Sequence, residues 1–139
     1  MSASALVGRW SLVSYEIAYP GRAAVAFLGD DPVGLLAYDA DGRLWVQFAR
    51  RDRPRLSTDD YLRAPAEEKV AAFDTVAAYF GTWEVDEPAR VVVHRVELAW
   101  NPNWTGSEQR RDYELDGDTL TLSSDKGWSS STLVWRRVA

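Results

Sequence analysis

About eight short segments of the chain alternate apolar and polar residues as β-strands do, and this repetition constrains the fold more than any other feature. Tight-turn signals such as Asp39-Ala40-Asp41-Gly42 and Asp116-Gly117-Asp118 separate several of them. Connections this short favour antiparallel neighbours, so the pattern predicts a mainly β protein, either a sandwich or an up-and-down barrel. The expected strands are Gly8–Tyr19, Leu35–Tyr38, Leu44–Ala49, Gly81–Val85, Arg90–Trp100, Gln109–Leu115, Thr119–Ser124 and Thr132–Val138.

One segment between the third and fourth expected strands has a helical pattern instead. Pro65 stands near its start, Glu67 and Glu68 lie in its first turn, and Gly81 follows as a stop. The pattern predicts an amphipathic helix of about four turns, whose apolar positions are Val70, Phe73, Val76, Ala77 and Phe80. Such a helix could plug or cover one end of a barrel, or pack on its outside. Tyr79, near its end, would then lie over the barrel mouth.

Length, charge and residue usage exclude several classes of protein. At 139 residues the chain is long enough for one continuous core, so we expect a single domain over residues 1–139. The net charge of −5 argues against a nucleic-acid partner. The lack of cysteine excludes disulfides, thiolate nucleophiles and cysteine-based metal sites.

Cofactor and membrane signals are also missing from the sequence. It has a single histidine and neither a glycine-rich phosphate loop nor a dinucleotide fingerprint, so we expect no metal site and no cofactor. No apolar run approaches the ~20 residues that span a bilayer, and the first residues lack a secretory pattern. We therefore expect a cytoplasmic protein with no membrane partner.

The single histidine, His94, lies in an expected strand. Alternation places it on the same face as Val92, Val96 and Leu98, so the imidazole is expected to point into an apolar interior. An imidazole that faces a cavity can donate, accept or shuttle a proton near neutral pH. The alternative is a core histidine that is bonded to a neighbouring side chain or to water.

The same alternation places other polar side chains on the inner face. Gln109 and Arg111 lie on the next strand, and Glu16 lies on the first strand unless a bulge turns Tyr15 inward instead. A buried polar group without a partner costs ~1–3 kcal/mol. Their clustering therefore predicts a place for the polar group of a ligand, with Glu16 as a partner for His94 or Arg111. An Arg111–Glu16 pair that is merely structural is the competing interpretation.

Several sequence motifs resemble those of a known family. They are the Gly8-Arg9-Trp10 opening with Trp135-Arg136-Arg137 on the last strand, and the ordered set Pro32-Val33-Gly34, Tyr79-Phe80-Gly81-Thr82-Trp83 and Asn101-Pro102-Asn103-Trp104. The set resembles the small bacterial and fungal lipocalin-like domain family, from about Leu6 to Val138. The resemblance implies a closed or nearly closed antiparallel barrel with a central cavity, often in a natural-product biosynthetic setting. Where members often have a second histidine, this chain has Arg95, which weakens any proposal of paired imidazoles.

Two functions compete on these grounds. The first is a cofactor-independent enzyme of natural-product metabolism that folds a hydrophobic substrate for cyclisation, isomerisation or dehydration. Its catalytic residues would be His94 as acid or base, with Glu16, Arg111 and Tyr79. The family setting and the inward histidine favour this hypothesis.

The second is a carrier that binds a hydrophobic small molecule without chemistry. A barrel filled by its own side chains is a third possibility. The side chains expected to bind the ligand are Gln109, Tyr38, Trp45, Trp83, Trp100, Trp104 and Tyr113. Apolar residues on outward strand faces are also compatible with a homodimer.

Overall fold

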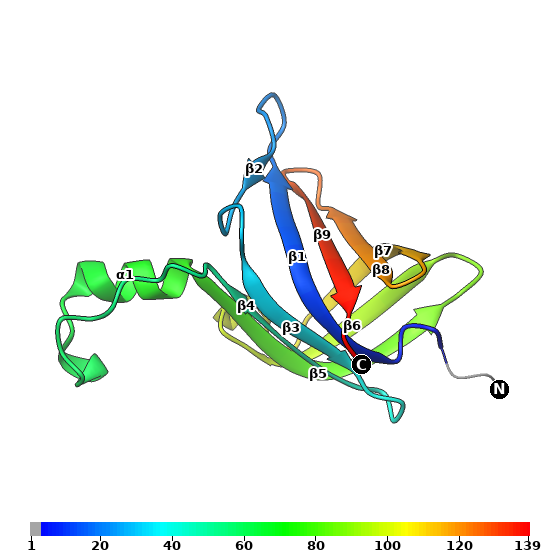
Figure 1. Ribbon diagram of the computed structural model, residues 1–139, viewed down its shortest axis with the longest axis horizontal. Coiled ribbons are helices and arrows are strands. Elements are labelled where there is room, and N and C mark those ends of the chain that lie inside the picture. Colours follow the sequence, from blue (N-terminus) through cyan, green and yellow to red (C-terminus); the bar gives the residue numbers. More distant parts are fainter. Residues whose placement is uncertain (1–3) are drawn as a thin grey trace.

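Eight long strands close into an antiparallel barrel in the computed structural model, which describes residues 4–139 (Figure 1). Each strand pairs with the next along the chain, and the first pairs with the last to close the ring. The predicted up-and-down barrel is confirmed. The barrel strands are β1 (Gly8–Ala18), β3 (Val33–Tyr38), β4 (Arg43–Ala49), β5 (Val76–Asp86), β6 (Val91–Ala99), β7 (Glu108–Asp116), β8 (Thr119–Asp125) and β9 (Ser130–Arg137), and a short β2 (Val25–Ala26) pairs with the end of β1.

The helix α1 (Ala66–Asp74) lies between β4 and β5, as expected, but it is nine residues long. The prediction of about four turns is therefore wrong. Residues from Val76 onward join β5 and pair with β4 from Ala49 to Arg43. This segment is rich in β-branched and aromatic residues, and a paired strand buries Ala77 and Tyr79 inside the barrel. Tyr79 is accordingly a barrel residue and not the end of a helix.

The helix does not plug the barrel. It projects away from the ends of β4 and β5 together with the short helix η1 (Tyr61–Arg63), and α1 has no buried residue (Figure 1). Phe73 in its last turn packs against Trp100, with ring centroids 6.4 Å apart. No helix in residues 4–139 is long and apolar enough to cross a membrane.

Two β-bulges change which side chains face inward. On β1 the pairing with β9 shifts between Leu12 and Ser14, so that Tyr15 lies opposite Leu133 and points inward. The expectation that Glu16 points inward is wrong, because the extra residue reverses the alternation and leaves Glu16 exposed. On β6 the pairing with β5 shifts opposite Gly81, which turns Leu98 outward, 55 % exposed, whereas it was expected beside His94.

The end of the barrel nearest the two termini is closed by a tryptophan and an arginine. Trp10 is fully buried, and its Nε1 donates to the carbonyl of Leu6 at 3.0 Å. The guanidinium of Arg137 lies 4.2 Å from the centre of the Trp10 ring and donates to the carbonyls of Val7 and Ala5. The 3₁₀ helix η2 (Pro102–Trp104) lies at the opposite end, between β6 and β7.

We expect Arg137→Met to lower the free energy of unfolding by about 2 kcal/mol, because it removes a cation–π contact and the donors to two backbone carbonyls. Urea denaturation measures the change. Arg136→Met is the matched control, since Arg136 lies next to it on β9 and is exposed. Equal losses in both variants would contradict the closing role of Arg137.

Candidate functional site

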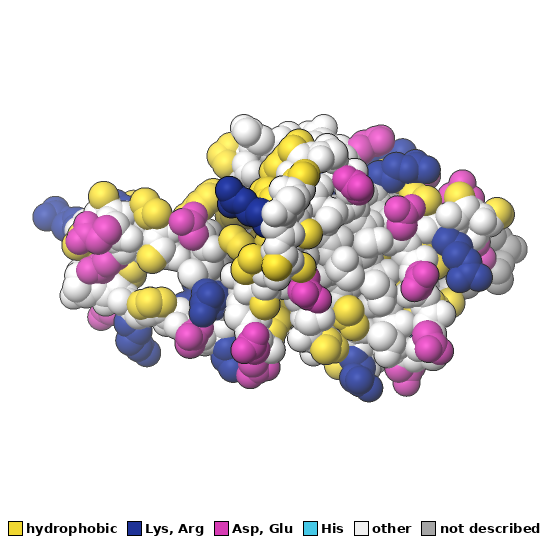
Figure 2. Space-filling model, turned by 90° about the horizontal axis from the view of Figure 1, so that it is seen from above, with side chains coloured by type: hydrophobic (Ala, Val, Ile, Leu, Met, Phe, Trp, Pro, Cys, Tyr) yellow, Lys and Arg dark blue, Asp and Glu magenta, His cyan; other side chains and the backbone are white. Residues whose placement is uncertain are grey.

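A cavity of about 710 Å³ opens at the end of the barrel opposite the termini. Its walls come from β1, β4 to β9, η2, the connection after β2, the β8–β9 turn and the last turn of α1. Seen from above, hydrophobic side chains gather near the middle of this face, and a basic side chain lies directly beside them (Figure 2). The volume is typical of a site for one small organic molecule.

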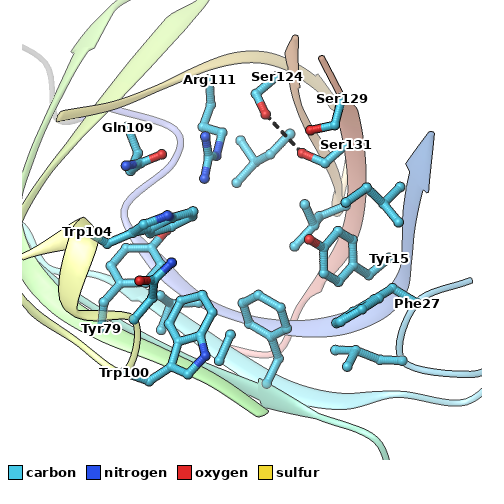
Figure 3. A pocket seen from close by; sticks show the side chains of 18 of the residues that line it. Tyr15, Phe27, Tyr79, Trp100, Trp104, Gln109, Arg111, Ser124, Ser129 and Ser131 are labelled. Atoms are coloured by element: carbon cyan, nitrogen blue, oxygen red, sulfur yellow. Dashed lines mark hydrogen bonds between the residues drawn. The ribbon is translucent and has the colours of Figure 1, made fainter. Parts of the chain in front are cut away.

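Aromatic side chains form two clusters on different sides of the cavity (Figure 3). On one side, the Tyr15 ring lies edge-on to Phe48 at 5.5 Å and to Phe27 at 5.9 Å. On the other, Trp104 lies 5.4 Å from Trp100 and 5.5 Å from Tyr79. The space between them suits a flat apolar ligand, because aromatic rings interact favourably by edge and by offset face.

Polar side chains line a third part of the wall (Figure 3). The hydroxyls of Ser124 and Ser131 are hydrogen-bonded to each other at 2.9 Å. Gln109 donates from Nε2 to the hydroxyl of Ser107 at 2.8 Å. In this orientation the amide oxygen of Gln109 faces the cavity (Figure 3). One side of the cavity can therefore orient the polar group of a ligand.

Arg111 is the charged group deepest in this wall. It is only 7 % exposed, and its guanidinium lies 5.6 Å from the centre of the Trp104 ring. No carboxylate within residues 4–139 forms an ion pair with it. Lys126, at the rim, lies 4.8 Å from the same ring, and its pKa is lowered by burial and by the nearby Arg111.

His94 is enclosed between two tyrosines. The hydroxyl of Tyr38 lies 2.6 Å from Nε2, and the hydroxyl of Tyr79 lies 2.8 Å from Nδ1. Burial, with Arg111 adding to it, lowers the pKa of His94 to about 3, so the ring is neutral at pH 7. Burial also raises the pKa of both tyrosines, although Arg111 partly offsets this.

The hydrogen bonds of Tyr38 indicate which nitrogen of His94 carries the proton. Among the described residues, the buried hydroxyl of Tyr38 has Nε2 as its sole partner, so it satisfies its own proton only by donating to Nε2. Nδ1 then carries the ring proton and donates to the oxygen of Tyr79. Tyr79, which lines the cavity, keeps its own proton to donate to a ligand.

The structure brings together six of the predicted site residues in the cavity wall, and their functional roles stay predictions. These residues are His94, Tyr79, Arg111, Gln109, Trp100 and Trp104.

Five other predicted site residues do not line the cavity. Tyr38 lies behind His94, and Trp83 packs on Tyr38 with ring centroids 4.7 Å apart. Tyr113 lies farther along β7, towards the closed end. Trp45 and Glu16 were expected at the ligand, and both placements are wrong, because these side chains lie on the outer surface.

Trp45 lies with Leu35 and Leu98 on an exposed apolar face of β3 to β6. Dimerisation through such a face stays a prediction.

Sequence reasoning did not assign several residues of the cavity wall. Phe27, Lys126 and Trp128 lie in connections, where strand alternation says nothing about direction. Phe48 belongs to an expected strand, but its inward direction was not assigned. An inward Tyr15 was the stated alternative for a bulged first strand, and the structure has that bulge.

A closed antiparallel barrel around an aromatic cavity defines this chain as a lipocalin-like protein. The sequence model of the lipocalin-like domain family matches residues 7–138, and the chain belongs to that family, as its motifs predicted. One curated relative is the 4'-hydroxy-3'-methoxypropiophenone carrier protein ppsC of Aspergillus oryzae. It is 33 % identical over 85 residues, which cover 57 % of this chain and 77 % of the relative.

Proposed function

We propose that this protein binds and carries a hydrophobic aromatic small molecule without covalent chemistry. The observation that carries the proposal is the cavity of about 710 Å³, with aromatic clusters on two sides and one polar wall. The name of the Aspergillus oryzae relative, a carrier of a phenolic aryl ketone, supports carriage over catalysis.

The cavity offers one orientation for such a ligand. Its ring would lie between the cluster of Trp100 and Trp104 and the cluster of Tyr15 and Phe48. A carbonyl or phenol oxygen on the ligand would accept a hydrogen bond from the hydroxyl of Tyr79, whose proton is not used in the bond to His94. These contacts bury apolar area and satisfy one polar atom, which is sufficient for binding without any catalytic group.

Cofactor-free catalysis is the second candidate function, and the chain of hydrogen bonds from Tyr38 through His94 to Tyr79 favours it. His94 itself is a poor base near pH 7, because its pKa is about 3 and both ring nitrogens are occupied. In a cyclisation, isomerisation or dehydration, Tyr79 would be the proton donor, and Arg111 would stabilise negative charge on the substrate oxygen.

We expect one molecule of 4'-hydroxy-3'-methoxypropiophenone to bind per chain and to quench tryptophan fluorescence. Trp104→Ala should weaken binding about tenfold or more, because Trp104 contacts both the aromatic cluster and Arg111. Trp45→Ala is the matched control, since it removes an indole from the outer surface. Fluorescence titration gives the affinities, and native mass spectrometry gives the stoichiometry.

Recovery of the ligand distinguishes the two functions. A carrier returns it chemically unchanged, whereas an enzyme returns an isomer or a dehydrated product that chromatography separates. Equal affinity of the Trp104 and Trp45 variants would place the ligand outside the cavity and overturn the proposal.

A further inference from the structure

We propose that the cavity selects aromatic ligands that carry an ionised acidic group, a carboxylate or a phenolate, and that Arg111 is the residue that determines this selectivity. The inference rests on the proposed function, since it names the class of ligand that the same cavity holds.

The first argument is that Arg111 lies near the hydroxyl of Tyr79 but has no counter-ion among the described residues. A guanidinium stays charged in proteins, and a largely buried charge without an opposite charge beside it is costly. Arg111 stacks on Trp104 but has no carboxylate partner among residues 4–139. Its guanidinium is directed into the cavity (Figure 3). An anionic ligand would supply the missing partner through charge-assisted hydrogen bonds.

The second argument is the sign of the other charges around the cavity. Lys126 adds a second cation at the rim, 4.8 Å from the Trp104 ring. Asp74 is the single acidic residue of the described lining, and it lies at the end of the projecting helix. His94 is neutral, and Tyr79 presents a proton. The interior of the cavity therefore favours negative charge and offers donors to it.

The third argument is the contrast with the rest of the molecule. The chain carries a net charge of −5, so its outer field repels anions. Arg95 and Arg43, on outward faces of the same barrel, are paired with glutamates. An unpaired arginine in the cavity wall is thus a local feature and does not follow from a generally basic protein.

A pair of competitors tests the proposal. The neutral dye N-phenyl-1-naphthylamine reports occupation of the cavity by its fluorescence. It is displaced with 1-naphthaleneacetate or with 1-naphthaleneacetamide, which share ring and shape and differ in charge. We expect the wild-type protein to bind the acetate at least tenfold more tightly than the acetamide.

Single substitutions identify the residue that causes the preference for the acetate over the acetamide. Arg111→Met should remove the preference while the neutral dye still binds. Arg110→Met, an exposed neighbour on β7, should keep it. Lys126→Met should reduce it only two- to threefold, because Lys126 lies at the rim. Retention of the full preference in Arg111→Met would overturn the assignment.

The outcomes separate this inference from the proposed function. If the dye and both competitors fail to bind, the proposed function itself fails. If the dye binds and the two competitors displace it equally from the wild-type protein, the cavity binds aromatic molecules and the charge selectivity is wrong. The wild-type comparison needs no variant, so it decides the question even if the Arg111 variant does not fold.

Discussion

Gly81→Ala is expected to lower the free energy of unfolding by about 3 kcal/mol or more, with a fall in Tm of roughly 10 °C. A Cβ at this position would lie 1.9 Å from the carbonyl oxygen of Arg95 and 2.9 Å from its carbonyl carbon. These are backbone atoms of the paired strand and cannot swing aside. β5 and β6 would have to separate at the bulge. Thermal and urea denaturation measure the effect.

Gly117→Ala is the control for this variant. Gly117 has a φ of +60° in the β7–β8 turn and open space around its Cβ position, so alanine there costs about 1 kcal/mol of backbone strain. The contrast separates a steric clash at Gly81 from the backbone strain of alanine at a positive φ. If Gly81→Ala lowers the free energy of unfolding no more than Gly117→Ala does, then β5 and β6 are not in close contact at Gly81, and the prediction is wrong. Tyr79 and His94 lie on the two strands involved, so ligand binding should weaken as well.

Acidification from about pH 7 to about pH 4.5 is expected to remove about 2 to 3 kcal/mol of stability through His94 alone. The pKa of His94 is about 3 in the folded protein, against an ordinary value of 6.5. Between these values the unfolded chain binds a proton that the folded protein does not bind. The contribution of neutral His94 to the free energy of unfolding is therefore fully retained above pH 6.5, and it is lost progressively as the pH falls towards 3.

His94→Gln isolates this effect from the titration of carboxylates. A glutamine amide can accept from Tyr38 and donate to Tyr79 but does not titrate in this range. Its free energy of unfolding should fall by about 2 to 3 kcal/mol less than that of the wild type over the same pH interval. Because the chain has one histidine, its imidazole NMR signals can be followed directly in the wild-type protein. An imidazole that becomes protonated near pH 6 while the protein stays folded would contradict the prediction.

The barrel was predictable because alternation and turn signals are local properties of the sequence. The inward directions of Gln109, Arg111 and Trp135 follow from the period of two, and the structure places all three in the cavity wall. The errors at Glu16 and Leu98 share one cause. Each lies just beyond a bulge, and a bulge depends on pairing with a strand distant in the sequence.

The helix was overextended for a related reason. Val76 to Phe80 satisfies a helical spacing as well as a strand spacing, and local propensity does not decide between them. Pairing with β4 decides in favour of a strand, and it brings Tyr79 to His94. The two tyrosines that bind His94 come from β3 and β5, so sequence spacing alone could not reveal the environment of its ring.

The extra residue in β1 has a consequence for how ligand preference can change among related barrels. With regular alternation, Glu16 would face inward, where a carboxylate could neutralise Arg111. The bulge near Val13 places Tyr15 inside instead and leaves Glu16 outside. Deletion of the extra residue Val13 would keep the present pairing and leave Tyr15 inside, whereas the same strand paired without a bulge would bring in Glu16 in place of Tyr15. The charge that such a barrel accepts can therefore diverge through the presence or position of a bulge, without any substitution in the strand.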